Sequence, residues 1–269
     1  MQLIRVDFDS NIGFGHLKRV ENFTDGIIVC IKCDEKYTNL PVIKIKNEDE
    51  FFEIVKKLNP NKVIVDNYNF KYEHEKKFKT LFPHIKLICF DDTYEKHFCD
   101  EIINVNPAAK REKYPKNIKV KILKKPLVSK NFKKAKKRHF KKEGIFVSFG
   151  GTDSKRIGLK VLKELKKLKK EIHFYTTSAN KNLEKLKKFC FLNKWCHLHI
   201  DEDVALGMAK SEFGIITPST ISLEAMYMDI PFIAVQVANN QKEIAKYLKH
   251  KRIKVLKENE IQKIPRFIP

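Results

Sequence analysis

The fold follows from one stretch near the N-terminus, Leu3-Ile4-Arg5-Val6-Asp7-Phe8-Asp9-Ser10-Asn11-Ile12-Gly13-Phe14-Gly15-His16. Its apolar first half predicts a β-strand, and its glycines predict a turn that opens a helix. Free backbone N–H groups at such a helix start can bind an anion such as phosphate. Gly13 and Gly15 let a ligand approach the backbone closely. The turn lacks the third glycine and the downstream acid of a dinucleotide fingerprint, so NAD binding is not expected.

A second strand and glycine turn occur in the other half of the chain, where 144–149 leads into Gly150-Gly151-Thr152-Asp153. Two such units predict two Rossmann-like domains that face each other across a cleft. We expect the N-terminal domain over 1–135 and the C-terminal domain over 143–269. The Lys-rich region 110–142 is interpreted as a solvated linker.

Strand-like and helix-like segments alternate in both halves, and the strands are apolar on both faces. This pattern is typical of parallel sheets covered by helices on both sides. The expected strands are 3–7, 26–31, 42–45, 62–66, 86–90 and 101–105, then 145–149, 172–176, 197–200, 213–216 and 231–235. The expected helices are 17–23, 49–58 and 72–81, then 156–168, 182–191, 203–210, 221–228 and 241–250.

Composition indicates a well-packed globular protein, because 42% of the 269 residues are hydrophobic and 20 are Phe. No apolar run approaches the ~20 residues of a membrane helix. The chain starts with a charged strand and no apolar signal core, so we expect a cytoplasmic monomer without membrane contact. Cys30 and Cys33 have the spacing of half a zinc site or a redox pair, but no second close pair accompanies them. We therefore expect all six cysteines to be buried, reduced thiols.

The net charge is +22, from 55 Lys and Arg against 33 Asp and Glu. Three explanations remain open: solvated Lys-rich helix faces, steering of an anionic small substrate, and nucleic-acid binding. Most of the excess lies on amphipathic helices and no nucleic-acid-binding motif is present. No stable nucleic-acid partner is therefore expected.

Candidate chemical groups of the first half follow its glycine turn and two of its strands. The residues 66–68 and 90–92 end strands of one parallel sheet, so we expect them to face the same cleft. His16 would lie at a helix start, where the helix dipole disfavours the imidazolium and keeps a neutral base available. The alternative is a histidine that caps its own helix or is hydrogen-bonded in a core. Tyr68 can donate to a sugar or a reacting water. Asp91 and Asp92 suggest a metal, but no third ligand has a convincing spacing. Neither a metal nor another cofactor is expected.

Three loops of the second half contain candidate ligand-binding residues. Gly150, Gly151 and Thr152 suit a diphosphate, unless the turn is an ordinary one in which Asp153 caps the helix. Ser219 and Thr220 can donate to phosphate at a helix start, and Glu224 can accept from ribose hydroxyls; a capping box is the alternative. Asn240 and Gln241 can contact a base or a sugar. In an open α/β sheet, loops at the carboxyl ends of strands form the binding crevice.

The motifs together resemble a known family. They are Asp9-Ser10-x-Ile12-Gly13-x-Gly15-His16-x-x-Arg19, Val65-Asp66-x-Tyr68, Phe90-Asp91-Asp92, Asn104-x-Asn106, Phe149-Gly150-Gly151-Thr152-Asp153, Ser222-x-Glu224-Ala225 and Asn240-Gln241. In this order, over nearly the whole chain, they are similar to the UDP-sugar hydrolases of pseudaminic acid biosynthesis. Those enzymes remove UDP from UDP-2,4-diacetamido-2,4,6-trideoxy-β-L-altrose and share the GT-B fold of MurG-type glycosyltransferases.

The resemblance implies an inverting, metal-independent hydrolysis with a UDP-sugar as the partner. It implies that His16 and Tyr68 are catalytic. It also implies that substrate or UDP contacts come from Gly13, Gly15, Arg19, Gly150, Gly151, Thr152, Ser219, Thr220, Glu224, Asn240 and Gln241. Residues 125–132 depart from the family, because an expected Arg and Glu are absent, which leaves room for a different UDP-sugar. A GT-B glycosyltransferase and a non-catalytic nucleotide-sugar- or nucleic-acid-binding protein remain alternatives.

Overall fold

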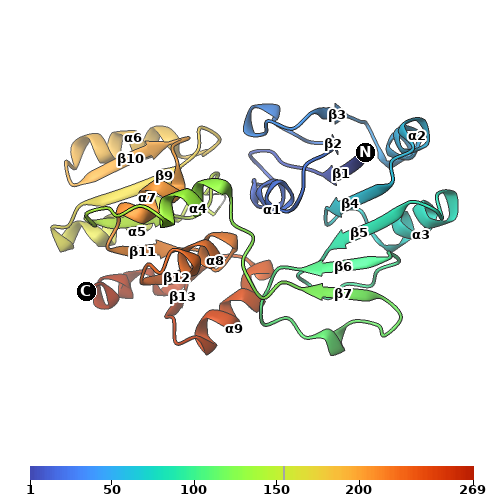
Figure 1. The fold of residues 1–269 in the computed structure, drawn as a ribbon. Coiled ribbons are helices and arrows are strands. Elements are labelled where there is room, and N and C mark those ends of the chain that lie inside the picture. The colour runs from blue at the N-terminus through green and yellow to red at the C-terminus, as the bar shows by residue number, and fades with distance from the viewer. Residues whose placement is uncertain (154) are drawn as a thin grey trace. The chain divides into compact units, whose positions relative to one another are not determined.

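The computed structural model describes residues 1–153 and 155–269. The chain divides into two compact units, Met1–Leu127 and Val128–Pro269. In Figure 1 the first unit runs from blue to green and the second from green to red. Each unit has its own sheet and its own hydrophobic core.

The first unit is built on a parallel sheet in the order β3-β2-β1-β4-β5-β6-β7 (Figure 1). The strands are β1 (Gln2–Val6), β2 (Ile27–Cys30), β3 (Val42–Lys44), β4 (Lys62–Asp66), β5 (Lys86–Phe90), β6 (Glu101–Asn104) and β7 (Lys119–Ile122). The helices are α1 (Gly15–Phe23), α2 (Glu48–Leu58) and α3 (Tyr72–Leu81), with 3₁₀ turns η1 (Glu35–Tyr37) and η2 (Arg111–Lys113).

Aromatic residues of α2 and α3 fill one face of this sheet. Phe51 and Phe78 are fully buried against Val63 and Val65 of β4. Helix α2 starts where the Asn47 side chain accepts a hydrogen bond from the Glu50 N–H at 3.0 Å, and it ends at Asn59 in the left-handed conformation. Apolar burial and caps thus set the helix that follows β3.

The second unit repeats the plan with a parallel sheet in the order β10-β9-β8-β11-β12-β13. Its strands are β8 (Ile145–Ser148), β9 (Ile172–Thr176), β10 (Cys196–Ile200), β11 (Phe213–Ile216), β12 (Phe232–Gln236) and β13 (Val255–Lys257). Its helices are α4 (Lys130–Lys136), α5 (Gly158–Leu165), α6 (Leu183–Leu192), α7 (Val204–Lys210), α8 (Thr220–Tyr227) and α9 (Lys242–His250), with η3 (Lys166–Leu168), η4 (Asn239–Gln241) and η5 (Glu258–Phe267).

The expected linker over 110–142 is wrong in its main parts. Strand β7 pairs in parallel with β6 and completes the first sheet. Helix α4 belongs to the second unit, because Phe132 and Ala135 are buried in its core beside Met208 of α7. Lysines dominate the composition of both segments, but every second residue of β7 and one face of α4 are apolar. The division between the units therefore lies at Leu127, before the expected end of the N-terminal domain at 135.

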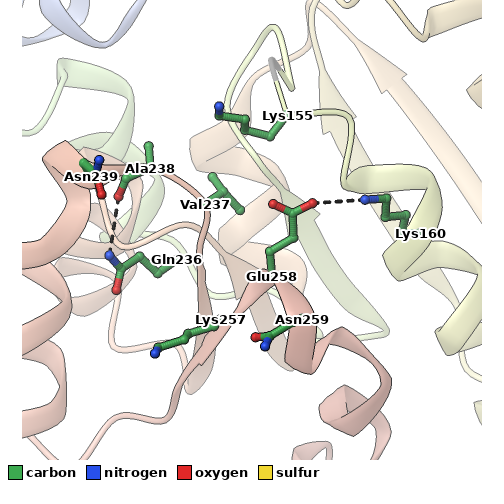
Figure 2. Close-up of a pocket in the computed structure, with 9 residues that line it drawn as sticks. All are labelled: Lys155, Lys160, Gln236, Val237, Ala238, Asn239, Lys257, Glu258 and Asn259. Carbon is green, nitrogen blue, oxygen red and sulfur yellow. Dashed lines mark hydrogen bonds and ion pairs between the residues drawn. The ribbon is translucent and has the colours of Figure 1, made fainter.

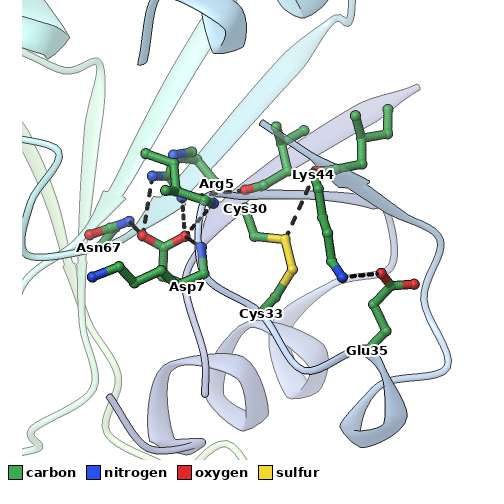
Figure 3. Close-up of a disulfide and its surroundings, with 11 residues drawn as sticks. Arg5, Asp7, Cys30, Cys33, Glu35, Lys44 and Asn67 are labelled. Carbon is green, nitrogen blue, oxygen red and sulfur yellow. Dashed lines mark hydrogen bonds and ion pairs between the residues drawn. A yellow bond between two sulfur atoms is a disulfide. The ribbon is translucent and has the colours of Figure 1, made fainter. Parts of the chain in front are cut away.

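The expectation of six reduced cysteines is also wrong. Disulfides join Cys30 to Cys33 (Figure 3) and Cys190 to Cys196. Their Cα atoms lie 6.1 Å and 4.8 Å apart, within the range that a disulfide spans. Cys33 lies close to Cys30 because the chain turns directly after β2 and residue 33 forms a β-bridge with Phe8. Cys89 and Cys99 are free thiols.

None of the helices in the described part of the chain combines the length and hydrophobicity that a bilayer-spanning segment needs.

Candidate active site

Helix α1 and strand β4 bring a histidine and an arginine onto one carboxylate. His16 and Arg19 are three residues apart and therefore lie on the same face of α1. Asp66 is the last residue of β4. Its Oδ1 lies 2.6 Å from His16 Nδ1. Arg19 donates to Asp66 Oδ2 through Nε at 2.6 Å and to Asp66 Oδ1 through Nη2 at 2.5 Å.

A second carboxylate extends this network beyond β5. Asp92 accepts from Arg19 Nη1 at 2.8 Å and from the Tyr68 hydroxyl at 2.8 Å. The Tyr68 ring meets the His16 ring edge-on, with centroids 4.7 Å apart. We call these five residues, His16, Arg19, Asp66, Tyr68 and Asp92, the His16 cluster. The sequence predicted that the residues after β4 and β5 would meet, because parallel strands end at one edge of a sheet.

Fixed charges surround His16. Burial alone would raise the pKa of Asp66, but the Arg19 charge and the His16 side chain hold that pKa well below its usual range. Burial works against the charged form of Arg19, yet Asp66 and Asp92 raise the Arg19 pKa further. Both ions therefore stay charged at neutral pH, and each compensates the other in a buried setting.

The pair of His16 and Asp66 has the geometry of a general base and its orienting carboxylate. Asp66 fixes the Nδ1 side of the ring, so Nε2 is the nitrogen that can take a proton from a ligand. The His16 side chain keeps 15% of its surface exposed, whereas that of Asp66 keeps 2%. The His16 ring is therefore largely covered but keeps some access to solvent.

The loop before α1 has the conformation that its glycines predicted. Gly13 has φ of +92°, and its N–H donates to the Asp9 carbonyl at 2.8 Å. The Asp9 carboxylate accepts from the N–H groups of Asn11 and Ile12. Phe14 occupies the N-cap position of α1, and its side chain makes no capping hydrogen bond. A Cβ on Gly13 or Gly15 would meet no atom within 4 Å, so the backbone is accessible there.

A buried ion network supports the loop that carries Tyr68. Arg5 of β1 is fully buried and donates to Asp7 at 2.7 Å (Figure 3). Arg5 also donates to Glu48 at 2.6 Å. Asp7 in turn accepts from the Asn67 amide at 2.9 Å. Asn67 stands between Asp66 and Tyr68 in the sequence, so this network fixes the backbone between two members of the His16 cluster.

In the second unit, the predicted diphosphate turn follows β8. Gly150 is exposed with φ of +83°, and no atom lies within 4 Å of the Cβ that another residue would add. The Gly151 carbonyl accepts from the hydroxyls of Thr176 and Thr177 at 2.8 and 2.9 Å, and Thr152 is buried. Asp153 accepts from the N–H groups of Ile157 and Gly158 at 3.0 and 2.9 Å. The turn is therefore open to a ligand at Gly150. At the start of α5, however, two backbone N–H groups already donate to the Asp153 carboxylate.

The other predicted residues of this unit follow β11 and β12. In the sheet, β11 lies next to β8, and β12 lies next to β11. Ser219 precedes α8, and its hydroxyl bonds to that of Thr217 at 2.9 Å instead of capping the helix. Ser219 is the N-cap of α8 and Thr220 its first residue, so the alternative of a capping box that starts at Thr220 does not match this helix start. Glu224 is half-buried one turn into α8. Asn240 is exposed, whereas the Gln241 side chain accepts from the N–H groups of Val237 and Ala238 and shapes its own loop.

A pocket of about 660 Å³ lies beside these loops, at the carboxyl ends of β12 and β13 (Figure 2). It contains the amides of Gln236 and Asn239 and three lysines. Its lining is Lys155, Lys160, Gln236, Val237, Ala238, Asn239, Lys257, Glu258 and Asn259. Sequence reasoning placed a ligand-binding loop here but missed the lysines, because nothing in the sequence separates them from the many lysines on solvated faces.

Comparison with known proteins identifies the family. No established family profile matches the sequence. The UDP-2,4-diacetamido-2,4,6-trideoxy-beta-L-altropyranose hydrolase of Campylobacter jejuni subsp. jejuni serotype O:2 is 32% identical over 269 residues, which cover 94% of this chain and 97% of the relative. The chain belongs to this hydrolase family. The resemblance that the motifs indicated is thereby confirmed.

Similarity to solved structures confirms the GT-B fold that was expected for this chain. MurG of Acinetobacter baumannii superposes with a TM-score of 0.61 at 11% identity, over 98% of this chain and 89% of MurG. The spinosyn rhamnosyltransferase SpnG, solved with thymidine diphosphate, gives a TM-score of 0.67 at 9% identity, over 97% of this chain and 89% of SpnG. Two parallel-sheet α/β domains with these neighbours define the GT-B fold class.

Proposed function

We propose that this protein hydrolyses UDP-2,4-diacetamido-2,4,6-trideoxy-β-L-altropyranose in pseudaminic acid biosynthesis. This is the substrate in the name of its Campylobacter jejuni relative. The observation that supports a hydrolytic step is the His16–Asp66 pair, with Nδ1 held by the carboxylate. A water molecule donates its proton to His16 Nε2 as its oxygen bonds to the anomeric carbon. The bond from that carbon to the diphosphate oxygen breaks, and UDP leaves with the electron pair, so the sugar is inverted.

The protein must supply a base and an oriented water, since UDP is already a good leaving group. A positioned base contributes ~10²–10⁴-fold, and holding the reactants in place contributes up to ~7–11 kcal/mol. Tyr68, whose hydroxyl bonds to Asp92, is the proposed partner that positions the water or the sugar. Arg19 keeps the Asp66 carboxylate ionised and donates a hydrogen bond to Asp92.

The second unit is the proposed UDP site. Three features lie at the carboxyl edge of its sheet. They are the turn Gly150–Thr152, which is exposed at Gly150, the hydroxyls of Ser219 and Thr220, and the pocket that includes Lys155 and Lys257. Lysines and exposed backbone N–H groups favour a diphosphate. Glu224 is the proposed ribose contact.

Hydrolysis at the anomeric carbon is proposed to need no metal at that site. Asp66 and Asp92 are the carboxylates of the His16 cluster, and both accept hydrogen bonds from Arg19. Catalytic Mg²⁺ or Mn²⁺ needs carboxylates that are available to the ion. The altered segment 125–132 keeps a related UDP-sugar open as the true substrate.

The test is UDP release from a panel of UDP-sugars in ¹⁸O-labelled water, with and without an acceptor alcohol and with excess EDTA. We expect label in the sugar hydroxyl, none in UDP and no requirement for the acceptor. Turnover should persist during brief exposure to EDTA, which removes free Mg²⁺ and Mn²⁺. His16→Asn should lower turnover at least ~10²-fold and keep UDP affinity, because a base acts on the barrier. His84→Asn, at an exposed histidine of the same unit, is the matched control.

Release of UDP only when the acceptor is present would assign the protein to the glycosyltransferases. Label in UDP would contradict attack at carbon. Loss of activity in EDTA that Mg²⁺ or Mn²⁺ restores would contradict the metal-independent step.

A further inference from the structure

Four side chains of the types that can bind a metal converge in the first unit outside the His16 cluster. Glu75 lies on α3, Cys89 on β5, and His97 and Cys99 on the segment between β5 and β6. One potential ligand atom from each lies within 4.8 Å of the other three. Glu75 and Cys89 are buried, and the His97 side chain is only 10% exposed.

The contacts within this group, which we call the Cys89 cluster, orient its donors inward. Glu75 Oε1 lies 2.7 Å from His97 Nδ1 and 3.4 Å from Cys89 Sγ. The other carboxylate oxygen, Oε2, accepts from the Phe98 N–H, which fixes the orientation of the group. Cys89 and Cys99 are the free thiols of the chain.

One polar atom in this cluster has no role in the structure as it stands. His97 Nε2 is buried and has no hydrogen-bond partner among the residues that the structure describes. Asp91 Oδ1 is the nearby carboxylate oxygen, at 3.9 Å. A histidine that binds a metal through one nitrogen usually donates its other N–H to such a carboxylate, which orients the ring. Nδ1 on a metal and Nε2–H directed to Asp91 would give both nitrogens a function.

The donor set fits zinc. Two thiolates, an imidazole and a carboxylate are ligands that Zn²⁺ accepts in tetrahedral structural sites. Zn–S bonds of ~2.3 Å and Zn–N bonds of ~2.0 Å place the donors less than ~4 Å from one another, so small inward shifts convert the cluster into a site. Four protein ligands would leave no open position for a water, which is typical of a structural site.

We propose that Glu75, Cys89, His97 and Cys99 bind one structural Zn²⁺ ion in the first unit. Binding releases the two thiol protons and the additional proton of the His97 imidazolium to solvent, because, against the effect of burial, the carboxylates of Asp91 and Glu75 raise the pKa of His97 to about 10. The ion with two thiolates, one carboxylate and a neutral imidazole then has a net charge of −1. The site joins α3 and β5 to the segment 91–100. Because that segment begins with Asp91 and Asp92, the metal would hold in place the carboxylate that contacts Arg19 and Tyr68.

Metal content and Co²⁺ spectra of the full chain, purified with reductant, test the proposal. We expect zinc at one ion per chain and, after exchange with Co²⁺, a thiolate-to-cobalt charge-transfer band together with the intense visible bands of tetrahedral Co²⁺. Cys99→Ser should weaken Co²⁺ binding by more than the ~10–100-fold that loss of an outer partner costs. The double variant Cys190→Ser/Cys196→Ser, at the disulfide of the second unit, should keep full metal binding.

The spectrum of the unmodified protein keeps the test valid even if Cys99→Ser fails to fold. Reduced protein that contains no zinc and shows no charge-transfer band would overturn the proposal. A Cys89–Cys99 disulfide in protein kept under reductant, or equal Co²⁺ affinity in Cys99→Ser and the parent, would also overturn it. None of these readouts depends on UDP-sugar hydrolysis, so the result is independent of the proposed function.

Discussion

Asp66 accepts hydrogen bonds from two side chains of one turn of α1, His16 and Arg19. It is 1% exposed, so its negative charge is compensated by these neighbours and not by water. In the proposed reaction, Asp66 acts through His16, by fixing which nitrogen carries the proton. It is a positioning residue for the base.

Asp66→Asn is predicted to lower kcat by ~10²–10⁴-fold, because an amide can hold the imidazole in the wrong tautomer. Affinity for UDP, which the second unit is proposed to bind, should change less than ~2-fold. Steady-state kinetics and calorimetric titration with UDP measure the two effects. Asp49→Asn, at a 78% exposed carboxylate of the same unit, should leave both unchanged. Equal loss of kcat and UDP affinity would indicate a general disruption of the fold instead.

The position of the His16 cluster was partly predictable from the sequence. A glycine turn before a helix, and polar residues directly after two strands, predicted that His16, Tyr68 and Asp92 would lie at one sheet edge. The pairing of His16 with Asp66 was not predicted, since three aspartates end these strands and sequence does not rank them. The Cys89 cluster was missed because Glu75, Cys89 and Cys99 come from a helix, a strand and a loop, with no short motif in common.

At the scale of elements, the start of α5 depends on one buried acid. Asp153 is 2% exposed and has φ of +39°. Burial raises the pKa of Asp153 from 3.8 to about 6, although the N–H groups of Gly158 and Ile157 favour the charged form. The folded protein therefore binds this proton more tightly than the unfolded chain does.

The Asp153 carboxyl should therefore contribute to the free energy of unfolding of the second unit below pH about 4. This contribution should fall as pH rises from about 4 to about 6 and be absent above the folded pKa. At about 1.4 kcal/mol per pKa unit, the change is of the order of 3 kcal/mol. In Asp153→Asn this contribution is absent. Urea unfolding followed by the fluorescence of Trp195, the single tryptophan, measures the free energy of unfolding of each protein across this pH range. A constant difference between the two proteins at every pH would contradict the shifted pKa.

Helix α8 presents the proposed ribose contact one turn after its start. We predict that Glu224→Ala weakens UDP binding by roughly 1–3 kcal/mol, the scale of hydrogen bonds to a charged group. Calorimetric titration measures it directly. Glu184→Ala, at an exposed glutamate of α6 in the same unit, is the control and should bind UDP normally. Unchanged affinity in Glu224→Ala would place the ribose contact on another residue.

Sequence reasoning missed β13 and η5 at the C-terminal end as well as β7 and α4, and the last two share a lysine-rich composition. In β7, Lys119 and Lys121 are exposed and alternate with half-buried Val120 and Ile122. Helix α4 buries two of its seven residues, and the others are mostly lysines. Charge dominates such short segments, so their periodicity is recognisable only when the neighbouring strand or helix is known. The long apolar strands were predicted correctly because both of their faces are buried.

At the scale of the whole molecule, the net charge of +22 suits an anionic substrate such as a UDP-sugar. If it steers the substrate, kcat/KM should fall as salt rises from ~50 to ~300 mM while kcat stays nearly flat, because screening acts on encounter. Stopped-time assays across this range measure both constants, with a neutral solute as the control for viscosity. A flat profile would leave the lysines as solvated faces. Tight, salt-sensitive binding of generic RNA or DNA would indicate the nucleic-acid alternative.

The pairing of β1 with β4 also makes the His16 cluster sensitive to insertions and deletions. Val6 lies opposite Asp66, and successive residues of β4 alternate between two faces of the sheet. Val63 and Val65 face the aromatic core of α2 and α3, while Asp66 faces α1. A shift of one residue within β4 would turn the carboxylate toward that aromatic core and leave Arg19 without its principal counter-ion. Homologous chains should therefore vary in length in the loops between these strands and keep the strand itself free of gaps.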